Sequence, residues 1–290
     1  MKPKVLMQID CDENPSSFDS IVAIDSGVDH LLTYGGVEID QITGLIHGAM
    51  FTRGPADLNR TAAFFGGSDV ASTTRLFERA KECFFGPLRI SMMSDPNGAN
   101  TTAAAAVLCA KRHMSFEQRK VVILGGTGPV GCRIAALVAA QNGNVVLASR
   151  NRQRAVAACD ELKSIVGDHA TVEPVEITDS RAAVTCLQET DAVFSAGAAG
   201  VELLHESWVE STSGLQVAID LNAVPPGGIG QIEVADRGTL RGGVACYGAM
   251  GVGGLKMKIH RKSLQSLFET NEAVLDLNEI YQAGCEIECG

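Results

Sequence analysis

The sequence predicts an α/β fold, in which strands and helices alternate along the chain and the strands pair in parallel. Short apolar runs of strand length alternate with longer segments of helical periodicity over most of the sequence. One of these runs breaks into three spaced glycines and continues as an alanine-rich stretch, which is how a doubly wound Rossmann-type sheet begins. With 290 residues and 46% hydrophobic content, the chain can bury two cores. We therefore expect an amino-terminal α/β domain, a Rossmann-type domain and a cleft between them.

The first domain is expected over residues 1–105, with residues 270–290 packing back on it through a last helix at 276–286. Pro15 opens its first helix, and the run Gly66-Gly67-Ser68-Asp69 ends one of its strands. The strands of this domain are predicted at 4–9, 29–34, 61–65 and 88–93, and its other helices at 16–24 and 70–84.

The second domain is expected over residues 106–269 and is entered through an alanine-rich helix at 103–111. A strand from residue 121 precedes the three glycines, and strand-like and helix-like patterns alternate beyond them. Strands separated by helical patterns favour a parallel sheet. The later helices are predicted at 133–140, 155–165 and 181–188, and the later strands at 145–149, 171–176, 192–195 and 216–220.

Gly126, Gly128 and Gly131 have the spacing of a dinucleotide-binding turn, in the required setting between a strand and a helix. Gly126 would permit the tight turn, Gly128 would let the backbone approach a pyrophosphate, and Gly131 would allow close contact between helix and strand. Free amides at the positive end of the helix would hold the phosphates. The alternative is a glycine-rich turn without a ligand, which rarely needs all three glycines. The candidate cofactor residues in this turn are Gly126, Thr127, Gly128, Pro129, Val130 and Gly131.

The end of the next strand favours NADP over NAD. About 20 residues after the glycines, where an acidic residue would hold the ribose hydroxyls of NAD, the sequence has Ser149, Arg150, Asn151 and Arg152. A hydroxyl, an amide and guanidinium groups suit the 2′-phosphate of NADP. The arginines could instead belong to the solvated start of a helix. We expect Arg150 to be the main contact, with Ser149 and Arg154 beside it, and NAD to be a weaker alternative cofactor.

Two glycine-rich segments follow predicted strands, at residues 195–200 and 220–230, and a third lies at residues 247–256. Ligands of parallel sheets bind outside the carboxyl ends of the strands, so we expect these segments to line a cleft for the cofactor and its substrate. Each segment taken alone could be an ordinary loop. The candidate cofactor residues in these segments are Ala196, Gly197, Asn222 and Gly253.

The composition is typical of an acidic cytoplasmic enzyme. A net charge of -10 argues against a nucleic-acid surface and against a basic patch for membranes. The amino terminus reaches Asp10 and Asp12 before a signal-like apolar run can form, and no apolar run is long enough to span a bilayer. The nine cysteines include no Cys-x-x-Cys pair, and Cys285 and Cys289 have no histidine nearby. We expect no disulfide framework and no metal.

Sequence blocks that are more specific than the glycine turn occur over nearly the whole chain. They are QIDCDENPSSF (8–18), NGANTTAAA (97–105), FSAGAAGVELL (194–204) and GAMGVGGLKMKIHR (248–261), with the shorter blocks Tyr34-Gly35, Phe84-Phe85-Gly86-Pro87 and Pro225-Pro226. Through these blocks the sequence resembles the bacterial NAD(P)-dependent methylene-tetrahydromethanopterin dehydrogenases of one-carbon metabolism. The resemblance implies oxidation of the methylene bridge of a tetrahydromethanopterin-type pterin to the methenyl cation, with transfer of a hydride to NADP. It also implies a homo-oligomer.

The resemblance suggests site residues as well. Lys256 matches the family's lysine near the nicotinamide and the pterin, although it could be a surface lysine beside Lys258. No proton leaves with the hydride, which agrees with the absence of a convincing acid–base constellation and points to catalysis by positioning and electrostatics. Some of the candidate pterin contacts have an ordinary explanation too, because Asn and Thr are common helix caps and an amphipathic helix would bury its Phe. These candidates are Phe18, Asp19, Asn97, Asn100, Thr101 and Thr102.

Three other functions stay open. A methylene-tetrahydrofolate dehydrogenase is one, although the bifunctional folate enzymes have a lysine four residues after a tyrosine, and here Glu38 stands four residues after Tyr34. A shikimate-type dehydrogenase is another, but its amino-terminal domain should carry a catalytic lysine, and no lysine lies between Lys4 and Lys81. The third is a non-enzymatic NADP-binding regulator, which would not need the extra amino-terminal domain.

Overall fold

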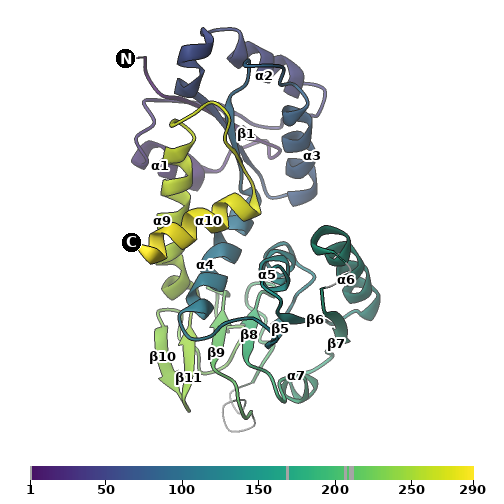
Figure 1. The fold of residues 1–290 in the computed structure, drawn as a ribbon. Coiled ribbons are helices and arrows are strands. Elements are labelled where there is room, and N and C mark those ends of the chain that lie inside the picture. Colours follow the sequence, from purple (N-terminus) through teal and green to yellow (C-terminus); the bar gives the residue numbers. More distant parts are fainter. Residues whose placement is uncertain (1, 168–169, 206–207, 209–211) are drawn as a thin grey trace. The chain divides into compact units, whose positions relative to one another are not determined.

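The computed structural model describes residues 2–167, 170–205, 208 and 212–290 (Figure 1). They form two compact units, each built on a sheet of mainly parallel strands, so the α/β fold class is confirmed. Unit 1 contains the chain up to Thr101 together with Met257–Gly290, and unit 2 is Thr102–Lys256. Residues 257–269, which the sequence patterns assign to the second domain, therefore lie in unit 1.

The sheet of unit 1 has five parallel strands in the order β12-β4-β3-β1-β2. β3 is buried along its whole length, as expected for a central strand of a parallel sheet with both faces covered. The register places the carboxyl ends of the two central strands side by side, with Asp10 opposite Gly66. The strands are β1 (Val5–Asp10), β2 (His30–Tyr34), β3 (Thr61–Gly66), β4 (Ser91–Ser94) and β12 (Val274–Leu275).

Side-chain caps define where several helices of unit 1 begin. The Ser16 hydroxyl accepts a hydrogen bond from the amide of Asp19, and the Asp69 carboxylate accepts two from the first turn of its helix. Asp276 and Glu279 form a capping box at the start of the last helix. The helices that lie wholly in unit 1 are α1 (Ser17–Asp25), α2 (Ile42–Met50), α3 (Val70–Lys81) and α10 (Leu277–Cys289), with short 3-10 turns at Pro55–Arg60 and Pro96–Gly98.

Helix α2 is absent from the elements predicted from the sequence. Its segment contains two glycines, which weaken the helical pattern. Ile42, Ile46 and Met50 nevertheless recur at helical spacing and are fully buried in the core of unit 1. Tertiary burial rather than local propensity therefore stabilises this helix.

The carboxyl-terminal segment of the chain lies in unit 1. β12 extends the sheet by pairing with β4, with Val274 opposite Met92. The hydroxyl of Ser91 also donates a hydrogen bond of 2.9 Å to the carbonyl oxygen of Thr270. Two long helices, α4 (Ala99–Lys111) and α9 (Ala249–Ser266), begin in one unit and end in the other.

Unit 2 contains a seven-stranded sheet in the order β10-β11-β9-β8-β5-β6-β7. All neighbouring strands are parallel except the β10–β11 pair at one edge. β5 pairs with both β6 and β8, so the strand order reverses at β5, where doubly wound sheets bind their ligands. The strands are β5 (Lys120–Leu124), β6 (Asn144–Ser149), β7 (Val172–Glu176), β8 (Ala192–Ser195), β9 (Val217–Asp220), β10 (Arg237–Arg241) and β11 (Val244–Tyr247). The helices that lie wholly in unit 2 include α5 (Pro129–Ala139), α6 (Arg152–Val166) and α7 (Ser180–Cys186).

The glycine-rich segment at residues 247–256 is mostly helical rather than an ordinary loop. After Tyr247 and Gly248, the segment forms the first two turns of α9. A Cβ on Gly248 would overlap the carbonyl oxygen of Glu233, and a Cβ on Gly251 would overlap that of Asp236. These glycines let the start of a helix lie directly on neighbouring backbone, which local sequence patterns do not reveal.

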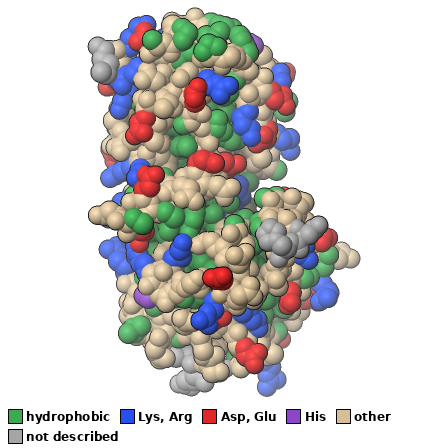
Figure 2. Space-filling view, in the orientation of Figure 1, with side chains coloured by type: hydrophobic (Ala, Val, Ile, Leu, Met, Phe, Trp, Pro, Cys, Tyr) green, Lys and Arg blue, Asp and Glu red, His purple; other side chains and the backbone are tan. Residues whose placement is uncertain are grey.

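In the described part of the chain, no helix is both long enough and apolar enough to cross a membrane. On the face drawn in Figure 2, acidic and basic side chains are interspersed.

Candidate functional site

The turn after β5 owes its shape to Gly125, and the expected assignment of the tight turn to Gly126 is wrong. Gly125 has a φ of +67°, and a Cβ on it would lie 2.6 Å from the Cα of Gly197. Gly126 is required for a different reason, because its Cβ would lie 2.7 Å from the Cδ2 of Leu147 in β6. A Cβ on Gly131 would lie 2.7 Å from the Cα of Gly126, so Gly131 brings α5 close to the turn.

Gly128 and the start of α5 provide a place for phosphates. Gly128 is the N-cap residue and Pro129 is the first residue of the helix. A Cβ on Gly128 would meet no atom closer than 3.5 Å, and Gly128 lines a cavity. The first amides of an α-helix have no partner within the helix and lie at the positive end of its dipole. A pyrophosphate group therefore fits at this turn.

The cavity has a volume of about 450 Å³ and lies at the carboxyl ends of β5, β6 and β8. Seven of the predicted cofactor residues line it: Thr127, Gly128, Ser149, Arg150, Arg154, Ala196 and Gly197. Its other lining residues are Leu124, Gly125, Ala148, Asn151, Ile177, Ala198, Val201 and Leu203. Six predicted residues lie outside the described lining: Gly126, Pro129, Val130, Gly131, Asn222 and Gly253.

One end of the cavity is basic and rich in hydrogen-bond donors. The Ser149 hydroxyl accepts a hydrogen bond of 3.2 Å from the amide of Asn151, and the Asn151 side chain caps α6 by accepting one of 3.0 Å from the amide of Arg154. These bonds fix the backbone from which Arg150 and Arg154 extend into the lining. Among the described lining residues there are two arginines and no carboxylate. This charge distribution fits a phosphate better than an uncharged diol.

Asp220, the last residue of β9, binds the loop that follows this strand. Its side chain is only 2% exposed and accepts hydrogen bonds from the amides of Asn222, Gly228 and Ile229. Burial raises the pKa of this carboxyl above its ordinary value, and the three amide bonds oppose that shift. The expected site residue Asn222 does not line the cavity. Its side-chain oxygen accepts hydrogen bonds from the amide of Gly200, in the loop after β8, and from that of Val224, in the loop after β9.

In unit 1, helix α1 exposes an aromatic ring and buries a carboxylate, the reverse of an ordinary amphipathic helix. Phe18 is 48% exposed and Asp19 is 8% exposed. The Phe18 ring lies 6.3 Å from that of His260, which stacks on Phe64 at 5.6 Å. A Cβ on Gly66 would lie 3.3 Å from an oxygen of Asp10 and 3.7 Å from one of Asp19, so these two carboxylates converge beside that glycine.

The polar residues at the start of α4 are organised by Asp95, which the sequence patterns did not single out. Asp95 is fully buried and accepts hydrogen bonds from the amides of Asn100 and Thr101 and from the Thr101 hydroxyl. The Asn100 side chain donates to the carbonyl oxygen of Ser94 and to Asp276. An aspartate before a proline at a helix start is a capping signal that could have identified Asp95.

The remaining candidates lie on other parts of the backbone. Asn97 occupies the left-handed region with a φ of 53° in the turn before α4, and Thr102 is the first residue of unit 2. Lys256 and Gly253 lie in α9 within unit 2, and Lys256 is half-buried. Neither is among the described residues that line the cavity.

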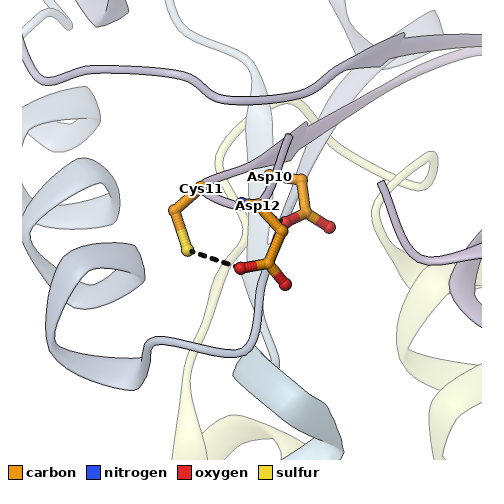
Figure 3. A group of neighbouring side chains, drawn as sticks. All are labelled: Asp10, Cys11 and Asp12. Carbon is orange, nitrogen blue, oxygen red and sulfur yellow. Dashed lines mark hydrogen bonds between the residues drawn. The ribbon is translucent and has the colours of Figure 1, made fainter. Parts of the chain in front are cut away.

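Asp10, Cys11 and Asp12 form a cluster with atoms close enough together to hold a metal ion (Figure 3). Their oxygen atoms already accept hydrogen bonds from the protein. Asp10 accepts from the amides of Asp12 and Ser16. Asp12 accepts from the amide and hydroxyl of Ser68. The cluster therefore joins the loops after β1 and β3.

Comparisons with known proteins agree with this architecture. A family model described as methylene-tetrahydromethanopterin dehydrogenase, N-terminal, matches residues 17–97, and a model described as shikimate / quinate 5-dehydrogenase matches residues 108–232. The chain is 42% identical to the bifunctional protein MdtA of Methylorubrum extorquens over 99% of this chain and 100% of that protein. It is 32% identical to the NAD(P)-dependent methylenetetrahydromethanopterin dehydrogenase of the same organism over 94% of both chains.

Solved structures share the fold at low sequence identity. The shikimate 5-dehydrogenase of Listeria monocytogenes aligns with a TM-score of 0.56 and 12% identity over 97% of this chain and 96% of that chain. The quinate dehydrogenase of Corynebacterium glutamicum aligns with a TM-score of 0.52 and 14% identity over 98% and 99%. At these identities the likeness shows the fold alone.

The fold and the cavity define a class: an oxidoreductase with two α/β domains, of which the second is a Rossmann-type NAD(P)-binding domain. Within this class, identities of 42% and 32% over nearly full lengths identify the family. The chain belongs to the methylene-tetrahydromethanopterin dehydrogenase family and is an enzyme of that family. The resemblance carried by the sequence blocks is thus confirmed.

Proposed function

We propose that this enzyme oxidises the methylene bridge of a tetrahydromethanopterin-type pterin to the methenyl cation and uses NADP as the hydride acceptor. The observation that carries the cofactor half of the proposal is the pair Arg150 and Arg154 in a cavity lining without a described carboxylate. The pterin half is supported by family membership and by the name of a relative, NAD(P)-dependent methylenetetrahydromethanopterin dehydrogenase.

The cofactor would lie across the carboxyl ends of β5, β6 and β8. Its pyrophosphate would sit at Gly128 and the first amides of α5, and its 2′-phosphate would lie by Ser149, Arg150 and Arg154. The bound cofactor supplies the acceptor for the hydride. Ala196 and Gly197 present a small, apolar surface against which a flat ring can lie.

The chemical step needs no proton acceptor from the protein. The carbon between two nitrogens loses one hydrogen together with its bonding electron pair, and the positive charge that remains is shared by the nitrogens. The residues then have to orient the two reactants and exclude water. We propose this role for Lys256, and pterin contacts for Phe18, Asp19, Asn97 and Thr102. The hydrogen bonds of Asn100 and Thr101 to Ser94, Asp95 and Asp276 favour the helix-capping explanation for those two residues.

A crossed turnover assay tests the proposal. Methylene-tetrahydromethanopterin and methylene-tetrahydrofolate are each offered with NADP and with NAD, and formation of the methenyl product is followed by its absorbance. We expect the highest kcat/KM for the pair methylene-tetrahydromethanopterin and NADP.

Faster turnover with methylene-tetrahydrofolate would assign the alternative substrate, and turnover of shikimate would assign the other dehydrogenase class. Binding of NADP without turnover of either pterin would support the regulator. The homo-oligomer stays a prediction, which size-exclusion chromatography with light scattering can check.

A further inference from the structure

Asp220 forms hydrogen bonds to a loop whose backbone contacts the lining of the cofactor cavity. Both of its carboxylate oxygens are engaged: one accepts from the amide of Asn222 at 3.1 Å, and the other from the amides of Gly228 at 2.7 Å and Ile229 at 3.2 Å. Asp220 itself does not line the cavity. Its effect on a bound ligand would therefore pass through the loop that it holds.

The first connection runs through Gly228 to the cavity wall. The carbonyl oxygen of Gly228 accepts hydrogen bonds from the amides of Leu203 at 2.8 Å and Leu204 at 3.1 Å. Leu203 lines the cavity, and its side chain lies against Gly197, where a Cβ would be 2.7 Å from the Leu203 Cδ1. Gly197 in turn lies against Gly125 of the phosphate turn, with 2.6 Å between a Cβ on Gly125 and the Gly197 Cα.

The second connection runs through Asn222. Its side-chain oxygen accepts hydrogen bonds from the amides of Gly200 at 3.3 Å and Val224 at 3.0 Å, and its side-chain nitrogen donates one to Pro226 at 3.1 Å. The loop after β8 is thereby joined to the loop after β9. Asp220 holds Asn222 in turn through its amide.

We infer that Asp220 is a positioning residue for the nicotinamide half of the cofactor: it holds the loop after β9, which supports the Ala196–Leu203 wall of the cavity. The topology places that wall on the β8 side of β5, whereas the basic end of the cavity follows β6 on the other side. The inference rests on the proposed binding of a dinucleotide. It goes beyond that proposal because it assigns a role to a residue that supports the cavity wall without contacting the phosphates.

Asp220→Asn is a sharp test, because the side chain keeps its size while its hydrogen bonding changes. An amide has one acceptor oxygen and one donor NH₂, whereas both Asp220 oxygens face backbone N–H groups. In either orientation the NH₂ group would face a backbone donor. We expect the variant to bind NADP and NAD about tenfold or more weakly, and by the same factor, since the wall does not distinguish the 2′-phosphate.

Binding of a fragment of NADP distinguishes loss of positioning at the nicotinamide half from a general loss of structure. Adenosine 2′,5′-bisphosphate carries only the adenosine half of NADP, so Asp220→Asn should bind it as tightly as the wild type does. The matched control is Asp191→Asn in the same unit, because both Asp191 oxygens also accept hydrogen bonds, from Arg119, Lys120 and Gln216, but at the amino end of β8. It should leave all three affinities unchanged.

Isothermal titration of the full-length protein measures each affinity. Unchanged NADP and NAD affinities in Asp220→Asn, or an equal loss of the fragment, would overturn the inference. If that variant does not fold, Asn222→Ala, which removes the second connection, should show the same pattern with a smaller loss, and unchanged affinities there would overturn it as well. Failure of the wild type to bind any dinucleotide would instead refute the proposed function.

Discussion

Arg150, just before the N-cap of α6, and Arg152, its first residue, differ in whether they line the cavity. Arg150 lines the cavity beside Ser149 and Asn151, whereas Arg152, also exposed, is not among the described lining residues. Both contribute one positive charge to the same stretch of surface. Comparing substitutions of the two arginines therefore distinguishes direct contact with a 2′-phosphate from a general effect of positive charge. Such a general effect falls off within about 8 Å at physiological salt.

Replacing Arg150 by alanine should weaken NADP binding about tenfold or more, the factor expected for loss of a charged hydrogen bond of about 1.5 kcal/mol. NAD lacks the 2′-phosphate, so its affinity should change little. Arg152→Ala serves as the control and should leave both affinities near those of the wild type. Fluorescence titration of each variant with both cofactors checks this, and equal losses of NADP and NAD in Arg150→Ala would contradict the 2′-phosphate assignment.

The cysteines should differ in reactivity according to burial. Burial raises the pKa of the Cys159 and Cys246 thiols to about 11, so both are protonated at neutral pH and shielded from reagents. Cys289 near the carboxyl terminus is exposed. Brief treatment of the folded protein with iodoacetamide at pH 8 should label Cys289 and leave Cys159 and Cys246 unlabelled, as peptide mass spectrometry can show. Labelling of those two in the folded protein would contradict their burial.

Helix α9 shows how glycines can serve packing within a regular element. Gly251 faces the backbone of Asp236, where a side chain has no room, whereas nothing lies within 4 Å of a Cβ on Gly253. Of these two glycines, which are only two positions apart in one helix, Gly251 has no room for a side chain and Gly253 has room for one. The sequence pattern alone suggests a loop for both.

Alanine substitutions at these two glycines should change stability in opposite directions. Gly251→Ala should lower the free energy of unfolding by about 1 to 3 kcal/mol, because the methyl group would displace the helix from the Asp236 backbone. Gly253→Ala should raise it by about 0.4 to 1 kcal/mol, because alanine restricts the unfolded chain and fits a helix. Urea unfolding followed by circular dichroism measures both, and destabilisation by Gly253→Ala would show that its surroundings are not open.

Elements with a strong local pattern were predictable, and those that depend on distant contacts were less so. Seven strands agree with their predicted spans to within one residue at each end: β1, β2, β3, β6, β7, β8 and β9. The β10–β11 hairpin was not predicted, although Gly242 and Gly243 join its strands with positive φ angles of 56° and 88°. A Gly-Gly pair between two short runs is a hairpin signal, so the sequence did contain the information.

At the scale of the whole molecule, the proposed reaction makes a prediction about pH. The positive charge left by the departing hydride is shared by two nitrogens, so no protein base has to titrate in the chemical step. Deuterium at the methylene carbon should slow single-turnover oxidation as a primary isotope effect, and the rate should vary little between pH 6 and pH 8, the range in which a histidine base would titrate.

A substitution of Lys256 can be tested in the same single-turnover experiment. If it only positions the pterin, Lys256→Ala should raise KM and leave residual turnover, whereas loss of an obligatory proton acceptor commonly costs about 100-fold to 10,000-fold in rate. A clear titration of the single-turnover rate near neutral pH, removed by substituting His30, His47, His205 or His260, would contradict the positioning mechanism.

The sequence by itself determined the α/β alternation, the dinucleotide turn after β5 and the basic residues after β6. Each of these depends on neighbours in the chain: the period of apolar residues, the spacing of glycines, and the residues that end a strand. Only the tertiary structure decided that Gly125 makes the tight turn and that Asp220 supports the cavity wall. These roles arise from close contacts between distant segments, such as Gly125 with Gly197 and Leu203 with Gly228, and no local pattern encodes which backbone a glycine will meet.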